Sequence, residues 1–365
     1  MTRLAWRRTW FQVHKWIGLL LAILIVPLSL SGAALVWHDA LDRLVSPARH
    51  AVTGSPTMTV DAYVAAARGA LTPGGRVAQL TMPEAGGPVV VAAQPAAAQP
   101  TRRGPPVRTM VYLDPPTARV LQVAPSNSGI VRFLHVLHGS LQLPGVGRQI
   151  VGWIGVAMMV SCFTGLWLWW PTVGRWVRGL RWRRHRNTDT NLHYVMGFWV
   201  ALPLFVVSLT GAWISFPGFF AAFGDGGGSR GPDRAAAMRA PALADPAQPL
   251  GIVVQRANSV GNGAIRSIAW PTARTPDWTV TYASGAIVKV ADDGGVAVAA
   301  PSRRPGGIAR VMRRIHDGDG MGIAWQMILF AAGLLPAALA VTGIIMWWRA
   351  RDWRAQRAKR GAASR

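Results

Sequence analysis

The chain has 365 residues, of which 51% are hydrophobic and only 15% are charged, with 18 Trp and a formal net charge of +24. This composition excludes a simple soluble globule. The charge is segregated: residues 1–15, 171–192 and 349–365 hold 17 Lys and Arg against two acids, whereas the much longer segments 38–149 and 217–322 hold 22 against 13. Basic residues that are concentrated in three short segments in this way are typical of the cytoplasmic parts of a membrane protein, which argues against nucleic acid as a partner.

Four apolar stretches without Asp, Glu, Lys or Arg occur at residues 16–37, 150–170, 193–216 and 323–348. Each is long enough to cross a hydrocarbon layer of about 30 Å as a helix. The first is too long for a signal peptide, and no A-x-A cleavage site follows it. The positive-inside rule then predicts a multi-pass protein of a bacterial inner (cytoplasmic) membrane, in contact with lipid, with both termini and the 171–192 loop in the cytoplasm.

The two halves of the chain are copies of one unit. With His14 aligned on His193, residues 29–33 (SLSGA) match residues 208–212 (SLTGA) without a gap. With His138 aligned on His316, the pair Thr164-Gly165 matches Thr342-Gly343. Both copies start in the cytoplasm, so they form parallel repeats whose equivalent residues face each other across an axis along the membrane normal. The Ser/Thr-Gly pairs are interpreted as helix-packing positions.

Each outer segment is predicted to form a small α+β module. In the first, a helix at 60–70 precedes strands at 77–82, 89–93, 107–113 and 120–123. In the second, a helix at 250–260 precedes strands at 265–270, 278–282, 287–290 and 296–299. The Gly-, Pro- and Ala-rich stretches 94–106 and 222–248 are expected to be loops.

Four histidines occupy equivalent positions in the repeats. His14 and His193 begin inside-to-outside spans, while His138 and His316 precede outside-to-inside spans, so the repeat axis pairs them on opposite sides. Two imidazoles facing each other in a bundle can supply both axial ligands of a haem iron. The pattern therefore predicts two haems, one near each face, with Gly18 and Gly197 leaving room for a macrocycle.

Several other residues lie near these histidines in the sequence or could replace them as ligands. His135 and His38 are alternative ligands on the outer side, whereas His50 and His185 have no repeat partner and are expected to be solvated. Cys162 lies in the second span and is expected to be a small core residue. Basic residues near the histidines are candidates to meet the haem propionates: Arg7, Arg8, Lys15, Arg132, Arg148, Arg313 and Arg314.

Nearly the whole chain resembles the PepSY-associated transmembrane helix family, often described as iron-regulated inner-membrane proteins. The resemblance is carried by the segments around His14, His138, His193 and His316, and by residues 111–120, which are similar to the strand-turn-strand signature of a PepSY domain with Asp114 and Thr117 shaping the turn. The resemblance implies a haem b reductase that passes electrons to ferric siderophores in the periplasm.

The predicted fold is a membrane α-helical bundle of four transmembrane helices from two parallel repeats, with two periplasmic α+β, PepSY-like domains. The first half is expected to consist of a cytoplasmic N-terminus with the first span (1–37), the first periplasmic domain (38–132), a His-bearing segment with the second span (133–170) and a basic cytoplasmic loop (171–192). The second half is expected to consist of the third span (193–216), the second periplasmic domain (217–315), a His-bearing segment with the fourth span (316–348) and a basic cytoplasmic tail (349–365).

The expected function is transmembrane electron transfer by two haem b groups, with reduction of a periplasmic ferric siderophore or other ferric chelate docked between the two modules. The single Cys and the absence of flavin motifs imply a separate cytoplasmic protein or a quinol as electron donor. Two other functions stay open. One is a haem-free PepSY-type binding or regulatory membrane protein. The other is a permease, although the spans hold no charged residue for an ion or proton relay.

Overall fold

The computed structural model describes residues 2–83, 86–95, 106–170, 177, 180–182, 185–221, 240–294, 296–300 and 307–363. Most of the predicted loops 94–106 and 222–248, and much of the 171–192 loop, lie outside these ranges. The chain divides into two compact units. The helical unit comprises Met1–His38, Leu134–Gly227 and Gly307–Arg365, and the sheet unit comprises Asp39–Phe133 and Gly228–Gly306.

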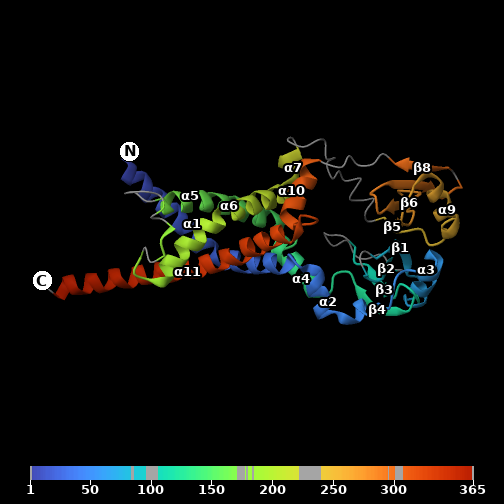
Figure 1. Cartoon of the computed structure of the whole chain (residues 1–365), viewed down its shortest axis with the longest axis horizontal. Helices are drawn as coiled ribbons and strands as arrows, with labels where there is room; N and C mark the ends of the chain where they lie inside the picture. Colours follow the sequence, from blue (N-terminus) through green and yellow to red (C-terminus); the bar gives the residue numbers. More distant parts are fainter. Residues whose placement is uncertain are drawn as a thin grey trace. The chain divides into compact units, whose positions relative to one another are not determined.

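Four long helices form the helical unit: α1 (Arg3–Leu35), α5 (Gly147–Trp169), α6 (Thr188–Ser215) and α11 (Gly322–Ala363). Each is long and apolar enough to cross a membrane. They pack in the cyclic order α1, α5, α6, α11, and the start of α1 and the end of α11 lie at the same end of the bundle (Figure 1). Their outward surfaces keep large apolar side chains exposed, such as Ile23 and Trp199, as expected of helices that face lipid.

Short helices connect the long ones to the sheet unit. They are α2 (His38–Val45), the 3₁₀ helix η1 (Pro47–His50), α4 (Ile130–Ser140), α7 (Pro217–Phe220) and α10 (Ile308–Asp317). Pro144 and Gly145 separate α4 from α5, and Gly318 in the left-handed conformation (φ 81°) ends α10 before α11. The two His-bearing segments are therefore short helices followed by a turn, rather than continuations of the spans.

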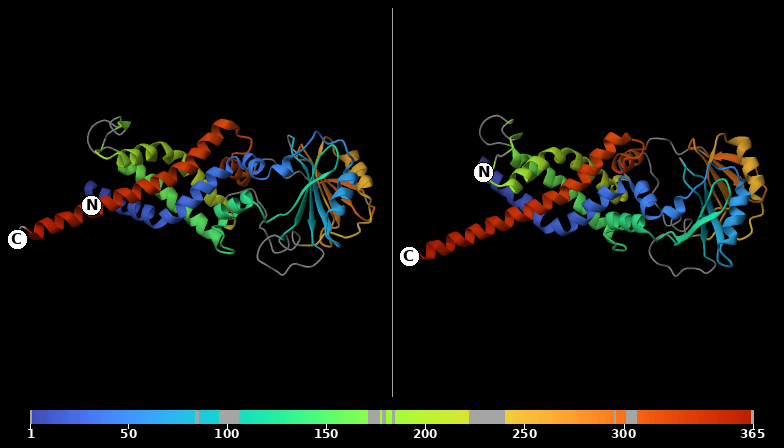
Figure 2. Two further views of the ribbon diagram at one scale, coloured as in Figure 1. Left: turned by 90° about the horizontal axis from the view of Figure 1, so that it is seen from below. Right: turned by 60° about the horizontal axis from the view of Figure 1, so that its bottom comes forward.

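The sheet unit holds one antiparallel sheet of eight strands in the order β4-β3-β2-β1-β5-β6-β7-β8. The strands are β1 (Arg76–Thr81), β2 (Val89–Gln94), β3 (Thr109–Leu113), β4 (Val120–Pro125), β5 (Ile265–Ala269), β6 (Asp277–Tyr282), β7 (Ile287–Ala291) and β8 (Ala297–Ala300). Figure 2 shows that α3 (Val60–Gly69) and α9 (Leu250–Val260) lie on one face of this sheet.

The two predicted α+β modules are halves of a single structure and do not form two separate domains. Strand β1 of the first half pairs with β5 of the second, with Leu80 opposite Ile268. Each module alone would leave this edge strand with unpaired backbone groups, and pairing the two edges satisfies them. Because β1 and β5 are hydrogen-bonded to each other, a chelate cannot dock between the two modules at these strands, contrary to the expectation.

One core unites both halves of the sheet. Tyr63 from α3, Val253 from α9, and Leu80 and Ile268 from the two central strands are all fully buried in it. Burying side chains of this size stabilises the unit by roughly 1.5–3 kcal/mol each. Buried positions alternate with less buried ones in β6 and β7, so every second residue lies in this core.

Candidate functional site

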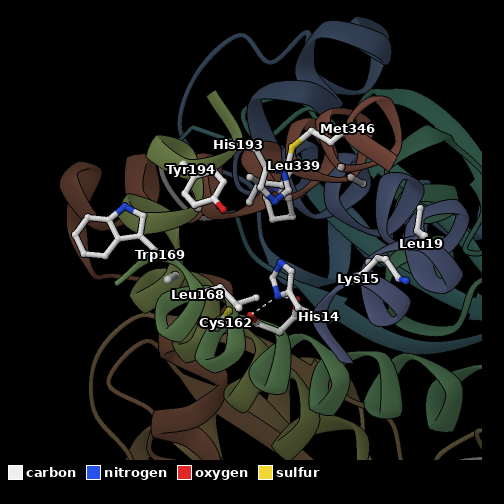
Figure 3. Close-up of a pocket in the computed structure, with 18 of the residues that line it drawn as sticks. His14, Lys15, Leu19, Cys162, Leu168, Trp169, His193, Tyr194, Leu339 and Met346 are labelled. Carbon is white, nitrogen blue, oxygen red and sulfur yellow. Dashed lines mark hydrogen bonds between the residues drawn. The ribbon is translucent and has the colours of Figure 1, made fainter. Parts of the chain in front are cut away.

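His14 and His193 face each other at one end of the bundle. His14 projects from α1 and His193 from α6, and their ring centroids are 6.4 Å apart with an interplanar angle of 89°. Figure 3 shows the two rings pointing toward one another across a pocket. The structure thus brings together the first pair that the repeat predicts.

His138 and His316 form the second pair. His138 lies on α4 and His316 on α10, with ring centroids 6.1 Å apart and planes tilted by 37°. Two imidazoles that bind one metal ion from opposite sides, through metal–nitrogen bonds of about 2 Å, have centroids roughly 6 Å apart. Both pairs therefore have the separation that a shared metal ion requires.

The second nitrogen of each ring is anchored on a neighbouring helix. Nδ1 of His138 lies 2.9 Å from the carbonyl oxygen of Leu28, and Nδ1 of His316 lies 3.1 Å from that of Val207. Nδ1 of His14 lies 3.2 Å from the carbonyl oxygen of Ser161. A carbonyl oxygen only accepts, so Nδ1 carries the proton and Nε2 is left with the lone pair that binds metal.

A hydroxyl three residues after each accepting carbonyl belongs to the same arrangement. Thr164 Oγ1 lies 3.0 Å from Nδ1 of His14, and Thr210 Oγ1 lies 3.0 Å from Nδ1 of His316. Thr342 Oγ1 lies 2.9 Å from Nδ1 of His193, which also bonds to the backbone of Leu339. Ser31 is the fourth of these hydroxyl residues. It donates to the carbonyl oxygen of Leu28, which also lies within hydrogen-bond distance of His138.

The glycine that follows each hydroxyl residue lies against the imidazole ring. A Cβ added at Gly32 would lie 2.7 Å from Cε1 of His138, and one at Gly211 would lie 3.0 Å from Cε1 of His316. At Gly165 the distance to Cε1 of His14 would be 3.1 Å, and at Gly343 the distance to Cε1 of His193 would be 3.5 Å. The four Ser/Thr-Gly pairs, predicted as helix-packing positions, form the seats of the four histidines.

The imidazoles of the second pair are neutral at pH 7. Burial, reinforced by repulsion from His138, lowers the pKa of His316 to about 4. Burial also lowers the pKa of His138 below its ordinary value. The neutral form is the one that binds metal through Nε2.

A cavity of about 380 Å³ adjoins the first pair, within the range of roughly 300–1,000 Å³ typical of ligand pockets. Gly18 and Gly197 line it, and a Cβ at Gly18 would meet nothing within 4 Å. Most of the lining is apolar, and Lys15 and Gln12 are among its few polar members. The cavity therefore suits a largely apolar ligand, and Gly18 and Gly197 both lie in its lining.

The two pairs lie at opposite ends of the bundle interior. Eighteen residues separate His14 from Gly32 on α1, and the same number separate His193 from Gly211 on α6, so the pairs are roughly 27 Å apart along these helices. Between them the interior is apolar and includes Cys162, which is buried as expected.

The remaining predicted residues have other contacts. His135 lies beside His38, with ring centroids 5.8 Å apart. His50 is not simply solvated, since its Nε2 lies 2.8 Å from Asp42. His185 packs on Tyr194 at 4.6 Å between ring centroids. The repeat did not predict these contacts, because none of these histidines recurs at the equivalent position of the other half.

Several basic residues predicted near propionates bond to the protein instead. Arg7 donates to the carbonyl oxygens of Trp167, Leu168 and Trp170 at the end of α5. Arg148 donates to Ile214, Arg313 pairs with Asp317 at 3.5 Å, and Arg314 donates to Asp319 and Gly320. Lys15, which bonds to Gln12, remains at the cavity.

These features define a membrane protein with four helices long and apolar enough to span, a sheet-bearing unit and two histidine pairs in the helical unit. The family model of the PepSY-associated TM region matches residues 11–350. The chain belongs to this family. No curated protein sequence matches it.

Proposed function

We propose that the protein is a dihaem b electron carrier that crosses a bacterial inner membrane and reduces a ferric chelate, such as a ferric siderophore, on the outer side. The observation that carries the proposal is the fourfold seat: each of four histidines is held through Nδ1 beside a Ser/Thr-Gly pair, and opposite rings are 6.4 and 6.1 Å apart.

The donor set fits haem better than a bare metal ion. Among the described residues, no group of three or more His, Cys, Asp or Glu is placed to hold a metal. Within the described part of the chain, each half-buried pair thus offers two imidazoles and no third ligand of these types. Haem carries its other four iron ligands in its own macrocycle, and a haem bound at each pair would supply one-electron redox chemistry.

The residues of this chain have defined tasks in the proposal. His14 and His193 hold one iron, and His138 and His316 hold the other. Lys15 faces the charged edge of the ligand in the first cavity. The apolar interior between the pairs excludes water, and their separation of roughly 27 Å is close to the thickness of a hydrocarbon core. A cytoplasmic protein or a quinol would supply the electrons.

An absorption spectrum of the purified protein tests the proposal. We expect a Soret band, sharp α and β bands after reduction, and two haems per chain by pyridine haemochrome analysis. A protein that stays colourless when it is expressed with ample haem would reject the proposal. Release of ferrous iron from a ferric chelate by the reduced protein tests the second half of the assignment.

A further inference from the structure

His38 and His135 form a third histidine pair that the proposed haem sites do not use. His38 stands at the start of α2, directly after α1, and His135 lies on α4 one turn before His138. Their ring centroids are 5.8 Å apart and their planes are inclined by 77°. This separation is close to the roughly 6 Å between two imidazoles that bind one metal ion from opposite sides.

One ring of this pair is oriented as metal ligands are. Nδ1 of His38 lies 3.2 Å from the carbonyl oxygen of Leu35, so it carries the proton and Nε2 is the nitrogen that would bind metal. This arrangement resembles that of the four histidines in the proposed haem pairs. The difference is that the accepting carbonyl lies only three residues before His38, at the end of α1.

One ring of this pair, that of His135, is more open to solvent than the half-buried rings of the haem pairs. His135 is exposed and His38 is half-buried, so water can complete the coordination of a small ion. A haem here would leave much of its apolar macrocycle in water. The site therefore favours a hydrated divalent ion.

The pair belongs to the first repeat alone. In the second repeat, Pro217 stands at the position of His38 and Arg313 at the position of His135. Arg313 forms an ion pair with Asp317, and a guanidinium at that place repels a cation. The duplication that built the haem seats therefore does not account for His38 and His135.

We propose that His38 and His135 form a binding site for a divalent transition-metal ion, and that this site receives ferrous iron as the chelate is reduced. The ion's source rests on the proposed function, whereas the site itself does not. One electron converts Fe(III) to Fe(II) without any change of atoms. Hard oxygen ligands hold Fe(II) less tightly than Fe(III), and imidazole nitrogens suit it, so the two rings replace two chelate or water oxygens.

The position along α4 supports this role. His135 is about 4.5 Å along the helix axis from His138, the residue assigned to the outer iron. A ferrous ion produced beside that iron would meet the two imidazoles before it diffuses away. A weak site of two protein ligands suits a product that must leave again.

Titration of Co²⁺ into the full-length protein in detergent tests the site. We expect about one Co²⁺ per chain, with affinity at least tenfold weaker in His38→Ala and in His135→Ala. Affinity should rise from Co²⁺ to Ni²⁺ to Cu²⁺, and anaerobic Fe²⁺ should compete with Co²⁺. His50→Ala is the matched control and should bind Co²⁺ as the unaltered protein does.

Three results would overturn the proposal: unchanged Co²⁺ affinity in both variants, loss of a haem from His38→Ala or His135→Ala, or no competition by Fe²⁺. Co²⁺ binding by a protein that contains no haem would uphold the site and reject the proposed electron carrier. The two proposals therefore fail separately.

Discussion

The helical unit and the sheet unit bring the matching segments of the two halves together in different ways. In the helical unit, equivalent residues of the two halves meet, and each histidine pair takes one ring from each half. In the sheet unit, the equivalent residues Asp114 and Asp292 each follow a strand of their own half, β3 or β7. Matching residues thus share a site where their side chains meet, and act as separate anchors where the two halves join edge to edge.

The two aspartates illustrate the second case. Asp114 is fully buried and accepts hydrogen bonds from the backbone N–H and the hydroxyl of Thr53. Asp292 accepts from the backbone N–H groups of Ala247 and Gln248 and from Nε1 of Trp278. Each carboxylate ties the segment before the helix of its own half to the end of a strand.

The largest expected effect is the loss of a whole haem from a shared site. His14→Ala and His193→Ala should each remove the same spectral component, because either change takes away one of the two axial imidazoles of the same haem. Haem content should fall from two to one per chain, measured by pyridine haemochrome analysis. His138→Ala and His316→Ala should remove the other component.

His50→Ala provides the control, since this residue pairs with Asp42 in the sheet unit. Abolition of one and the same component by His14→Ala and His138→Ala would show that the pairing across the repeat axis is wrong. If His135→Ala lost a haem while His138→Ala kept both, the outer ligand would move by one turn of α4.

A smaller effect is expected where the seat of a ring is filled. Gly32→Ala places a Cβ 2.7 Å from Cε1 of His138, so the ring must shift and affinity for the outer haem should fall by roughly 10–100-fold. Gly343→Ala, with 3.5 Å to His193, should be tolerated. Haem dissociation rates measure both.

Gly139→Ala is the matched control, because it lies next to His138 on α4 and an added Cβ meets nothing within 4 Å. Equal haem loss from Gly139→Ala and Gly32→Ala would mean that helix composition, rather than contact with the ring, sets the affinity.

In the sheet unit we expect a change confined to one half. Burial alone would raise the pKa of Asp114, but hydrogen bonds from Thr117 and Thr53 outweigh it and hold the pKa below its ordinary value. The stabilisation is therefore complete above the ordinary pKa of about 3.9 and is lost as the pH falls through the folded-state pKa. Asp114→Asn should lose roughly 1–3 kcal/mol at neutral pH and most of this acid dependence.

Hydrogen exchange of the full-length protein measures this change. Protection should fall in β3 and β4 of Asp114→Asn and stay unchanged in β7 and β8, since each half has its own carboxylate. The exposed Asp245 supplies the control substitution, Asp245→Asn. Equal loss of protection in both halves would show that the two anchors are coupled through the sheet.

The smallest effect is expected for Thr342→Val, which removes the hydroxyl 2.9 Å from Nδ1 of His193 at nearly constant volume. The backbone partner at Leu339 remains, so both haems should be retained. Loss of one such hydrogen bond costs about 0.5–1.5 kcal/mol, a roughly two- to tenfold weaker affinity for the inner haem. Thr342→Ser should restore the affinity for the inner haem. An unchanged affinity in Thr342→Val would show that the hydroxyl does not help to hold His193.

Local patterns predicted most secondary structure. The strands and α9 lie within two residues of their expected ranges, because alternating and helical periodicities act over a few residues. Helix α1 begins at Arg3, well before the apolar stretch that starts at residue 16. Hydrophobicity alone does not predict this first part of the helix, in which Arg7 binds the end of α5.

Contacts between distant segments could not be predicted in the same way. The alignment showed the Ser/Thr-Gly pairs and the histidines as separate matches, and nothing local says that Gly32 touches His138 across more than 100 residues. Their fixed offsets in both repeats were the available signal. The pairing of β1 with β5 also had no local signature, because either edge strand could have stayed open.

The pairing of β1 with β5 has a consequence for synthesis of the protein. The chain from Thr81 to Ile265 includes two spanning helices, and at about 5–20 residues per second a ribosome needs roughly 10–40 s to make it. During that time β1 has been translated while its partner has not, and its edge is open to other strands. Synthesis of α5 and α6 therefore precedes completion of the sheet, and a chain stalled in that interval presents an edge on which it can aggregate.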